Sequence, residues 1–135
     1  MQRRPFLQTL CGASIATAFA QAQETPKKLG WALVGLGSLS TNQIAPALLK
    51  TNNARLAAVV TGSPEKGKQW SEKYGFDASH IYSYETFDKI IDDADVDVVY
   101  IVLPSSMHRE FVERAAKAGK HVFCEKPMAN TADDC

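Results

Sequence analysis

The sequence predicts an α/β fold in which a doubly wound parallel sheet is covered by helices on both faces. Three observations support this prediction. Five short apolar segments alternate with segments of helical period. Each apolar segment is a continuous run, which is typical of parallel strands buried on both faces. A glycine motif follows the first apolar segment directly, as expected for a fold that binds a ligand at the ends of its strands.

The expected strands are short and rich in β-branched or aromatic residues. The fourth is the most apolar, and Pro104 ends it because proline cannot donate a hydrogen bond to the sheet. The third is the shortest of the five. We expect the strands at residues 31–34, 56–61, 80–82, 96–102 and 121–124.

The segments between these strands have the period of helices. Pro64 suits the first turn of the second helix, and Gly75 and Gly119 provide C-terminal stops for the second and fourth helices. Pro46 lies early in the first helix, so it either kinks that helix or moves its start to a later residue. We expect the helices at residues 43–50, 65–74, 84–92 and 108–118.

Length and composition fit one ordinary globular domain. The 135 residues are 45% hydrophobic and 22% charged, and the formal net charge is +0. This balance lacks the basic excess that nucleic acids or anionic membranes require, so we expect neither as a partner. Cys124 and Cys135 lack the spacing of a disulfide framework or a metal site, and we expect no metal. His80 and His121 lie at strand starts, where we expect structural roles.

The first twenty residues have the features of an export signal. Arg3 and Arg4 precede two large apolar residues in the twin-arginine pattern, and a weakly apolar stretch then leads to small residues suited to cleavage. The stretch is too short and too rich in small residues to span a bilayer, which needs about 20 apolar residues. The alternative is an uncleaved amphipathic helix. We expect a twin-arginine signal at residues 1–20, a linker at residues 21–28 and a domain at residues 29–135. The predicted route is the twin-arginine translocation machinery to the periplasm, with no membrane association after cleavage.

The segment from Gly35 to Ser40 matches the phosphate-binding turn of Rossmann-type dinucleotide-binding domains. Gly35 permits the tight turn out of the first strand, and Gly37 lets the backbone approach a pyrophosphate without an intervening Cβ. The helix start that follows aims backbone N–H groups at phosphate oxygens. Ser40 fills the third glycine position of the motif. Two glycines alone are weak evidence, and their place after the first strand is what indicates a dinucleotide site.

The end of the second strand indicates which dinucleotide binds. Folds restricted to NAD usually place a carboxylate there for the adenosine ribose, and a carboxylate repels a 2′-phosphate. In this sequence Thr61 and Ser63 offer hydroxyls and Lys66 offers an ammonium, all of which suit a phosphate. We therefore predict NADP as the cofactor, with NAD possible. The alternative is that Lys66 is a solvated helix residue and that Glu65 takes the carboxylate role.

Together with the glycine motif, two further segments resemble a known enzyme family. They are residues 103–108, Leu-Pro-Ser-Ser-Met-His, and the Glu-Lys-Pro tripeptide at residues 125–127. The resemblance is to the glucose-fructose oxidoreductase, inositol dehydrogenase and rhizopine-catabolism (Gfo/Idh/MocA) family, and it covers about residues 29–135. It implies an oxidoreductase that transfers a hydride between NADP and a small sugar or polyol. It also implies a C-terminal α/β substrate domain that is missing from this chain, an inactive fragment, and a homo-oligomer at full length.

The resemblance also implies a set of cofactor contacts. The contacts at the pyrophosphate are Gly35, Gly37, Ser38 and Leu39. Thr61 and Lys66 are placed at the 2′-phosphate, and Tyr84 is placed near the adenosine end. The contacts on the nicotinamide side are Leu103, Pro104, Ser105, His108, Glu125 and Lys126. Ser105 stands where many family members have Asn. The main acid/base residue of the family belongs to the second domain, beyond Cys135.

Lys126 is the candidate catalytic residue. In the family this lysine lies beside the nicotinamide and the substrate hydroxyl, where its charge polarises oxygen and supports proton movement. The alternative is a lysine that closes a turn before Pro127. For His108 we favour loop packing or a capping hydrogen bond over catalysis, because a helix starts just behind it.

Two other functions stay open at this point. One is an exported NAD-dependent glycoside hydrolase, because some of those enzymes share this fold, an export signal and the Glu-Lys-Pro lysine. The other is a nucleotide-binding protein without catalysis. Release of nitrophenol from a nitrophenyl glycoside would indicate the first, and a bound cofactor inert toward sugars and glycosides would indicate the second.

Overall fold

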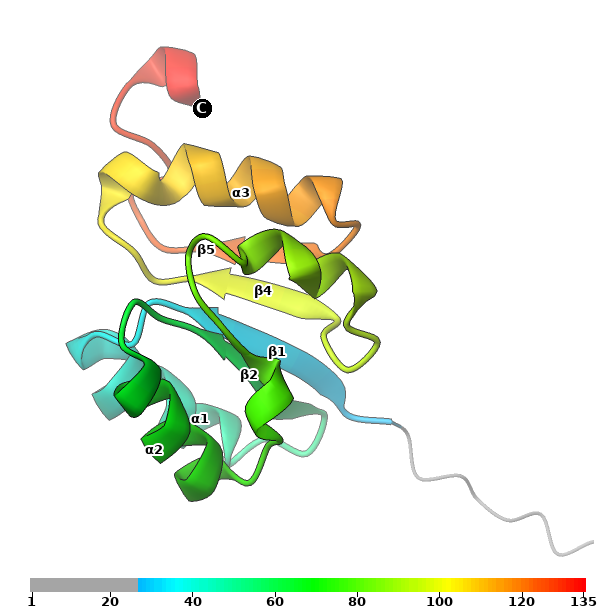
Figure 1. The fold of residues 1–135 in the computed structure, drawn as a ribbon. Coiled ribbons are helices and arrows are strands. Elements are labelled where there is room, and N and C mark those ends of the chain that lie inside the picture. Colours follow the sequence, from blue (N-terminus) through cyan, green and yellow to red (C-terminus); the bar gives the residue numbers. More distant parts are fainter. Residues whose placement is uncertain (1–26) are drawn as a thin grey trace, which may run out of the picture.

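The computed structural model describes residues 27–135, so the signal expected at residues 1–20 and most of the linker lie outside the described residues. In the described part, five strands form one parallel sheet in the order β3-β2-β1-β4-β5 (Figure 1). This order confirms the predicted doubly wound sheet and places its switch point between β1 and β4. The strands are β1 (Leu29–Val34), β2 (Ala54–Val60), β3 (Ile81–Tyr82), β4 (Val98–Ile101) and β5 (His121–Cys124).

Helical segments cover both faces of the sheet. The helices α1 (Ala45–Leu48) and α2 (Pro64–Tyr74) pack on one face, and α3 (His108–Lys117) packs on the other (Figure 1). A 3₁₀ turn, Phe87–Asp92, shares the face with α3. This arrangement follows from the right-handed crossovers that join parallel strands.

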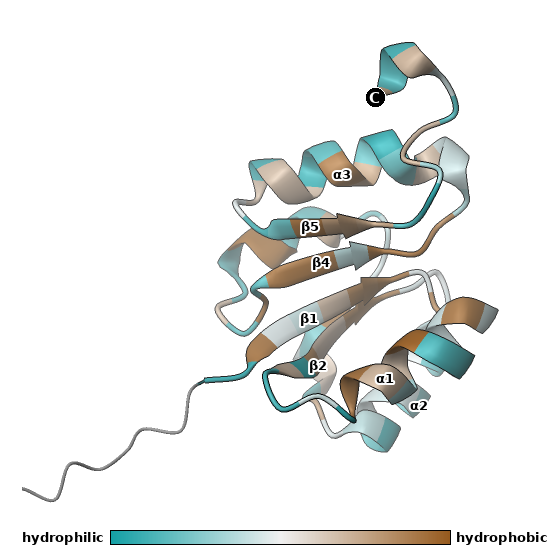
Figure 2. Cartoon of the chain, turned by 180° about the vertical axis from the view of Figure 1, so that it is seen from behind, coloured by the Kyte–Doolittle hydropathy of each residue, from teal (hydrophilic) through white to brown (hydrophobic). Residues whose placement is uncertain are grey.

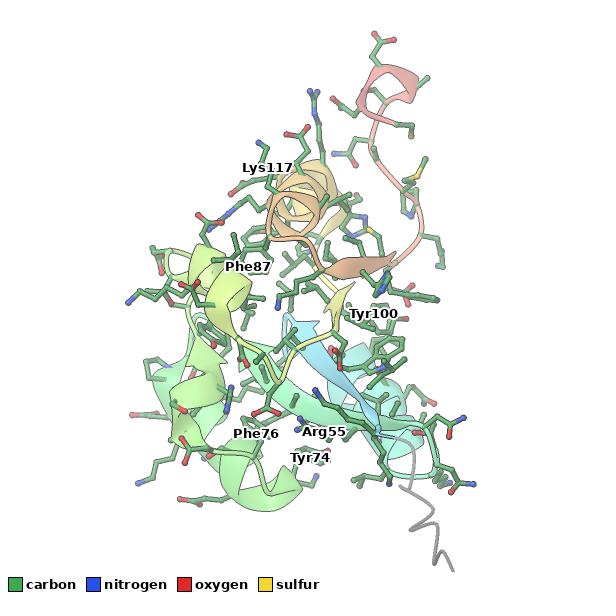
Figure 3. All side chains as sticks on the ribbon, turned by 90° about the vertical axis from the view of Figure 1, so that its right-hand side faces the viewer. Arg55, Tyr74, Phe76, Phe87, Tyr100 and Lys117 are labelled. Atoms are coloured by element: carbon green, nitrogen blue, oxygen red, sulfur yellow. The ribbon has the colours of Figure 1, made fainter. Side chains whose placement is uncertain are left out.

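Each face of the sheet has its own hydrophobic core, because successive strand residues point to opposite faces. On the α1 and α2 face, Leu33 and Val59 pack with Trp70. On the α3 face, Phe87 and Phe111 pack edge to face at 5.1 Å over the strands. The strands are largely apolar, and α2 and α3 carry polar residues on their surfaces (Figure 2). Phe87, from the 3₁₀ turn, packs on one face of the sheet, and the ring of Tyr100, from β4, lies on the other (Figure 3). Burying each large apolar side chain contributes about 1.5–3 kcal/mol, so these two cores hold the sheet together.

The predicted helices at α2 and α3 are confirmed to within one residue. Ser63 caps α2, because its hydroxyl accepts a hydrogen bond from the Lys66 N–H at 3.3 Å, and Pro64 occupies the first turn. Gly75 ends the helix with a φ of 74°. Gly119, with a φ of 69°, follows α3 in the same way. Both stops use a left-handed conformation that glycine adopts without strain.

The first helical segment departs from the prediction. Helical backbone begins at Ser38, directly after the glycine turn, and not at Gln43. It is a π-helix over Ser40–Ile44, in which the Ala45 N–H donates to the Ser40 carbonyl, and it becomes α-helical at α1. Proline in a regular α-helix clashes with the carbonyl four residues earlier, and the wider π turn ahead of Pro46 relieves that clash. The proline therefore did not move the start of the helix to a later residue, which was one of the two predicted outcomes.

The helix predicted at residues 84–92 is wrong. Only the 3₁₀ turn Phe87–Asp92 forms there. Ser83 and Thr86 exchange hydrogen bonds, since the Ser83 N–H donates to the Thr86 hydroxyl at 2.9 Å and the Thr86 N–H donates to the Ser83 hydroxyl at 3.2 Å. This reciprocal pair is a capping box, the pattern that normally starts a helix, and residues 84–86 form a turn that leads into the 3₁₀ segment. The 3₁₀ repeat of three residues then buries both Phe87 and Ile90.

A polar network ties β3 to the start of β4 at the amino edge of the sheet. Asp93 is 7% exposed and accepts hydrogen bonds from His80 Nδ1 at 2.7 Å and from the Tyr82 hydroxyl at 2.8 Å. Burial alone would raise the pKa of Asp93, but these hydrogen bonds outweigh it and hold the pKa below its ordinary value of 3.8. Burial and the hydrogen bond to Asp93 raise the pKa of Tyr82. The structure thus assigns His80 to a structural role.

Replacing Asp93 by asparagine is expected to lower the free energy of unfolding by about 1–3 kcal/mol, because the variant loses a buried charged acceptor. The lowered pKa means that this stability is present above about pH 4 and is lost as the pH falls through the folded-state pKa. Urea unfolding at about pH 7 and about pH 2 should therefore show a difference between the proteins that shrinks in acid. The neighbouring exposed Asp92 provides a matched control as Asp92→Asn. Equal urea midpoints at neutral pH would contradict the prediction.

Between residues 27 and 135, no helix has both the length and the apolar composition needed to cross a bilayer. Cys124 and Cys135 are both free thiols. His121 is exposed at the start of β5, and its backbone N–H donates to the Asp97 carbonyl at 3.1 Å.

Candidate functional site

The predicted site residues follow the carboxyl ends of the strands, which meet at one edge of the parallel sheet. The loop after β1 begins at Gly35, the loop after β2 at Thr61, and the loop after β4 at Val102. Tyr84 follows β3, and Glu125 follows β5. In open α/β sheets, ligands bind in the crevice at this edge and at the switch point, here between β1 and β4. Segments far apart in the sequence thus share one edge.

Gly35 occupies a position where no other residue fits. Its φ is 91°, and a Cβ there would lie 2.5 Å from the Val102 carbonyl oxygen. Its N–H donates to the Val60 carbonyl at 2.9 Å, so the turn is tied to β2 while it passes under the loop after β4. The predicted tight turn therefore requires glycine for its positive φ and for its close approach to Val102.

Gly37 and Ser40 play different parts in the same motif. A Cβ on Gly37 would meet no atom of residues 27–135 within 4 Å, so this part of the structure leaves the backbone there open to an approaching ligand. Ser40 is fully buried, and its hydroxyl donates to the Gly35 carbonyl at 2.6 Å. Ser38 and Leu39 are exposed at the start of the helical segment, where their backbone N–H groups have no intrahelical partners. This geometry fits an anion at the helix start.

Lys66 lies against the glycine turn. Its ammonium donates to the carbonyl of Leu36, the residue between the two glycines. Thr61 is 6% exposed, and its hydroxyl accepts from the Ser63 N–H at 3.2 Å, so it closes the turn that leads into α2. Glu65 is exposed on the first turn of α2. The ammonium of Lys66, and not the carboxylate of Glu65, is therefore held at the glycine turn that follows β1.

Tyr84 lies beside the loop after β2. A Cβ on Gly62 would stand 3.3 Å from the ring of Tyr84, and the ring packs edge-on against Phe111 at 5.7 Å. The Arg114 guanidinium donates to the Tyr84 carbonyl at 3.0 Å and so holds this turn on α3. Burial raises the pKa of Tyr84. Tyr84 therefore borders the side of the edge where the resemblance places the adenosine.

His108 joins the loops that follow β4 and β5. The ring is 1% exposed, with Nε2 2.8 Å from the Leu103 carbonyl and Nδ1 2.8 Å from the Pro127 carbonyl. Each ring nitrogen thus faces a carbonyl oxygen, which can only accept a hydrogen bond. The side chain is enclosed by protein, which supports the predicted packing role. Pro104 is exposed and Ser105 half-buried in the loop that this histidine anchors.

Lys126 differs from its neighbours, because its side chain is exposed and has no hydrogen-bond partner among residues 27–135. Glu125, just before it, is held firmly. Its N–H donates to the Ile101 carbonyl at 3.0 Å, and its carboxylate accepts from the Tyr100 hydroxyl at 2.5 Å. Lys126 and Glu125 border an open hollow of about 460 Å³ along the outer edge of β5. An ammonium on an anchored backbone can contact a substrate that enters from this side.

Sequence reasoning missed three residues of this edge. Ser40 was noted only as a departure from the glycine motif, although a small hydroxyl residue there can bond back to the turn. Leu36 supplies a backbone carbonyl, which no side-chain pattern reveals. Tyr100 lies inside a predominantly apolar strand, and its hydroxyl is a polar group that called for a partner.

The arrangement fits a dinucleotide. Open backbone at Gly37 and free N–H groups at the helix start suit a pyrophosphate, and the ammonium of Lys66 stands beside them. Three of the loops at the edge carry groups that donate hydrogen bonds or positive charge, which complements an anionic cofactor. Lys126 lies beyond β4, on the far side of the switch point from Lys66. A ligand that spans both lysines has to cross the glycine turn.

Comparison with solved structures gives two informative neighbours. Aldose-aldose oxidoreductase from Caulobacter crescentus, complexed with glycerol, is 58% identical with a TM-score of 0.78, over 81% of this chain and 32% of that chain. KijD10, a 3-ketoreductase from Actinomadura kijaniata in complex with NADP, is 26% identical with a TM-score of 0.70, over 80% of this chain and 33% of that one.

Comparison with known protein sequences gives a relative of the same kind as these structures. The dTDP-3,4-didehydro-2,6-dideoxy-α-D-glucose 3-reductase of Streptomyces violaceoruber is 34% identical over 111 residues, which are 82% of this chain and 31% of that protein. The chain thus spans about a third of the length of the relatives it matches. The family model described as "Oxidoreductase family, NAD-binding Rossmann fold" matches residues 29–135. The chain therefore belongs to this family, Gfo/Idh/MocA, which confirms the predicted resemblance.

Proposed function

We propose that the protein is an NADP-dependent oxidoreductase that acts on a sugar or polyol, and that the described domain holds the cofactor. The observation that carries this proposal is the open backbone at Gly37, at the start of a helix and at the switch point of the sheet. Lys66 lies on one side of it, and the loop of Lys126 lies on the other. The relatives support the substrate class, because their names describe reductases and oxidoreductases of sugars.

Each part of the edge has a separate task in the proposed reaction. A nicotinamide cofactor bound at this edge would supply hydride transfer to or from the substrate carbon. Backbone N–H groups after Gly37 would hold its pyrophosphate, and Lys66 would hold its 2′-phosphate. Lys126 directs its exposed ammonium at the substrate oxygen, where the charge stabilises a developing alkoxide and Nζ can hold or release a proton. His108 keeps the two loops on the nicotinamide side together.

The test is a spectrum of the full-length protein purified from its natural host. Absorbance in the reduced-nicotinamide band is recorded while glucose, fructose or a nitrophenyl glycoside is added. Cycling of the band with free sugars is the expected result. No change of the band with any sugar or polyol would overturn the proposal. The relatives named above are oxidoreductases and reductases, so we do not favour the glycoside hydrolase or the non-catalytic protein.

The place of action is part of the same proposal. The twin-arginine pattern at Arg3 and Arg4 supports export of a folded, cofactor-loaded protein to the periplasm. A homo-oligomer at full length follows from the family resemblance alone. Cell fractionation of the natural host tests the first point, and light scattering of the purified protein tests the second.

Replacing Lys66 by alanine is expected to shift the ratio of the NADP and NAD dissociation constants toward NAD by tenfold or more. The physical reason is the loss of a charge-assisted hydrogen bond to the 2′-phosphate, worth about 1.5–3 kcal/mol. Fluorescence titration of the full-length protein with each reduced cofactor measures the ratio. NAD lacks the 2′-phosphate, so its own affinity should change little.

Lys68, two residues further along α2 and exposed, provides the control for charge alone. Lys68→Ala should leave the ratio within about twofold of the wild-type value, since screening by salt weakens an exposed charge at a distance. An unchanged ratio in Lys66→Ala would remove Lys66 from the cofactor site.

A further inference from the structure

Tyr100 lies on β4 with its ring on the sheet face opposite to α3 (Figure 3). Its hydroxyl donates to the Glu125 carboxylate at 2.5 Å. The next residue of β4, Ile101, accepts the Glu125 N–H at 3.0 Å. Two consecutive residues of one strand therefore hold both the backbone and the side chain of Glu125, which directly precedes Lys126.

The direction of the Tyr100 hydroxyl is set by aromatic packing. The ring meets Phe123 at 4.9 Å with an interplanar angle of 74°, and Trp31 at 6.0 Å with an angle of 69°. Edge-on contacts of this kind fix a ring in place as well as burying it. Burial, together with the hydrogen bond to Glu125, raises the pKa of Tyr100 to about 12, so the hydroxyl keeps the proton that it donates.

The other side of Lys126 is anchored as well. Pro127 follows it, and the Pro127 carbonyl lies 2.8 Å from Nδ1 of His108, the first residue of α3. Lys126 thus stands between two residues that β4 and α3 hold, while its own side chain is exposed. A fixed backbone restricts where the ammonium can reach, and small displacements of a reacting group cost rate.

We propose that Tyr100 is a positioning residue for Lys126, acting through the carboxylate of Glu125. This inference rests on the proposed function, in which Lys126 contacts the substrate. Without the Tyr100 hydroxyl the Glu125 carboxylate is free to turn toward the neighbouring ammonium, and Lys126 loses its placement. Tyr100 itself does not contact the substrate.

The test uses Tyr100→Phe in the full-length protein, because phenylalanine keeps the ring packing and removes only the hydroxyl. We expect kcat for sugar oxidation to fall about 10- to 100-fold, with the NADP dissociation constant within about twofold of wild type. Glu125→Asp, which draws the carboxylate back by one methylene, should cause a similar loss. Tyr74→Phe, the removal of a hydroxyl from an aromatic pair elsewhere on the domain, is the matched control and should leave kcat unchanged.

A double-mutant cycle separates positioning from general stability. In a Glu125→Ala background, Tyr100→Phe should change kcat less than twofold, because the group through which it acts is gone. A loss of equal size in both backgrounds would overturn the inference. So would kcat within twofold of wild type in both Tyr100→Phe and Glu125→Asp.

The emission of bound NADPH gives a readout that needs no turnover. Lys126→Met should shift the emission maximum, and Tyr100→Phe should shift it in the same direction. A Tyr100→Phe protein with wild-type emission, where Lys126→Met is shifted, overturns the inference. A wild-type protein that binds NADPH but reduces or oxidises no sugar overturns the proposed function instead, and the emission comparison still decides the role of Tyr100.

Discussion

Replacing Lys126 by methionine is expected to lower kcat for sugar oxidation by about 10²- to 10⁴-fold, the range that one general acid or base supplies. Methionine retains most of the length of the side chain and removes its charge. Lys126 is exposed and makes no hydrogen bond with residues 27–135, so the loss would come from the reaction and not from the fold. Single-turnover absorbance of the reduced nicotinamide measures the rate.

The dissociation constant of NADP separates catalysis from binding in this variant. We expect it to stay within about tenfold of wild type, because the lysine contributes at most one hydrogen bond to the cofactor. Lys117, an exposed lysine on α3 with 78% of its side chain accessible, serves as control in Lys117→Met. Rates that are equal in Lys126→Met and Lys117→Met would show that Lys126 only closes the turn before Pro127.

Replacing Gly35 by alanine is expected to lower the free energy of unfolding by about 2–5 kcal/mol and to abolish dinucleotide binding. A Cβ at this residue would stand 2.5 Å from the Val102 carbonyl, and the φ of 91° strains any residue other than glycine. Both penalties act on the turn that joins β1 to the helical segment. Urea unfolding and cofactor titration measure the two effects.

Gly37→Ala should leave the stability of the fold nearly unchanged and weaken cofactor binding. In the described part of the chain no atom lies within 4 Å of a Cβ at Gly37, and the φ of Gly37 is not positive, so the free energy of unfolding should change by less than about 1 kcal/mol. A cofactor that approaches the open backbone would meet the new methyl group, and we expect the NADP dissociation constant to rise about tenfold or more.

Gly75 provides a control for backbone strain alone. Its φ of 74° resembles that of Gly35, but a Cβ on Gly75 would meet no atom of the described residues within 4 Å, and Gly75 lies at the end of α2 away from the cofactor edge. Gly75→Ala should cost about 1 kcal/mol of stability and leave binding unchanged. Unaltered NADP affinity in Gly37→Ala would place the pyrophosphate elsewhere.

Features that depend on neighbouring residues were predicted well. The ends of α2 were predicted from Pro64 and Gly75, which lie within one helix length of each other, and the structure adds Ser63 as the N-terminal cap. The strands were identified because a continuous apolar run can be recognised in the sequence without knowing which strands pair with it. The predicted placement of the site loops at one edge followed from parallel order alone, and the strand order confirms it.

Two helix predictions failed where another type of helical turn formed. Pro46 indicated a kink or a later start, but helical backbone begins at Ser38, and the π turn before the proline has no side-chain signature. Residues 84–92 have helical spacing, and Ser83 and Thr86 form a capping box, but the segment is a 3₁₀ turn that packs both Phe87 and Ile90 into the core. Tertiary packing overrode the local preference there.

The sequence by itself determined the succession of strands and helices along the chain, the glycine turn and the edge of the sheet at which the site lies. Each of these depends on residues close together in the chain or on strand direction. Only the tertiary structure decided what holds the site in place. Tyr100 and Glu125 are 25 positions apart, His108 and Pro127 are 19 apart, and Lys66 reaches back 30 positions to Leu36. Such contacts depend on how elements pack, and no local pattern of residue types records the partner that a buried hydroxyl, imidazole or ammonium will meet.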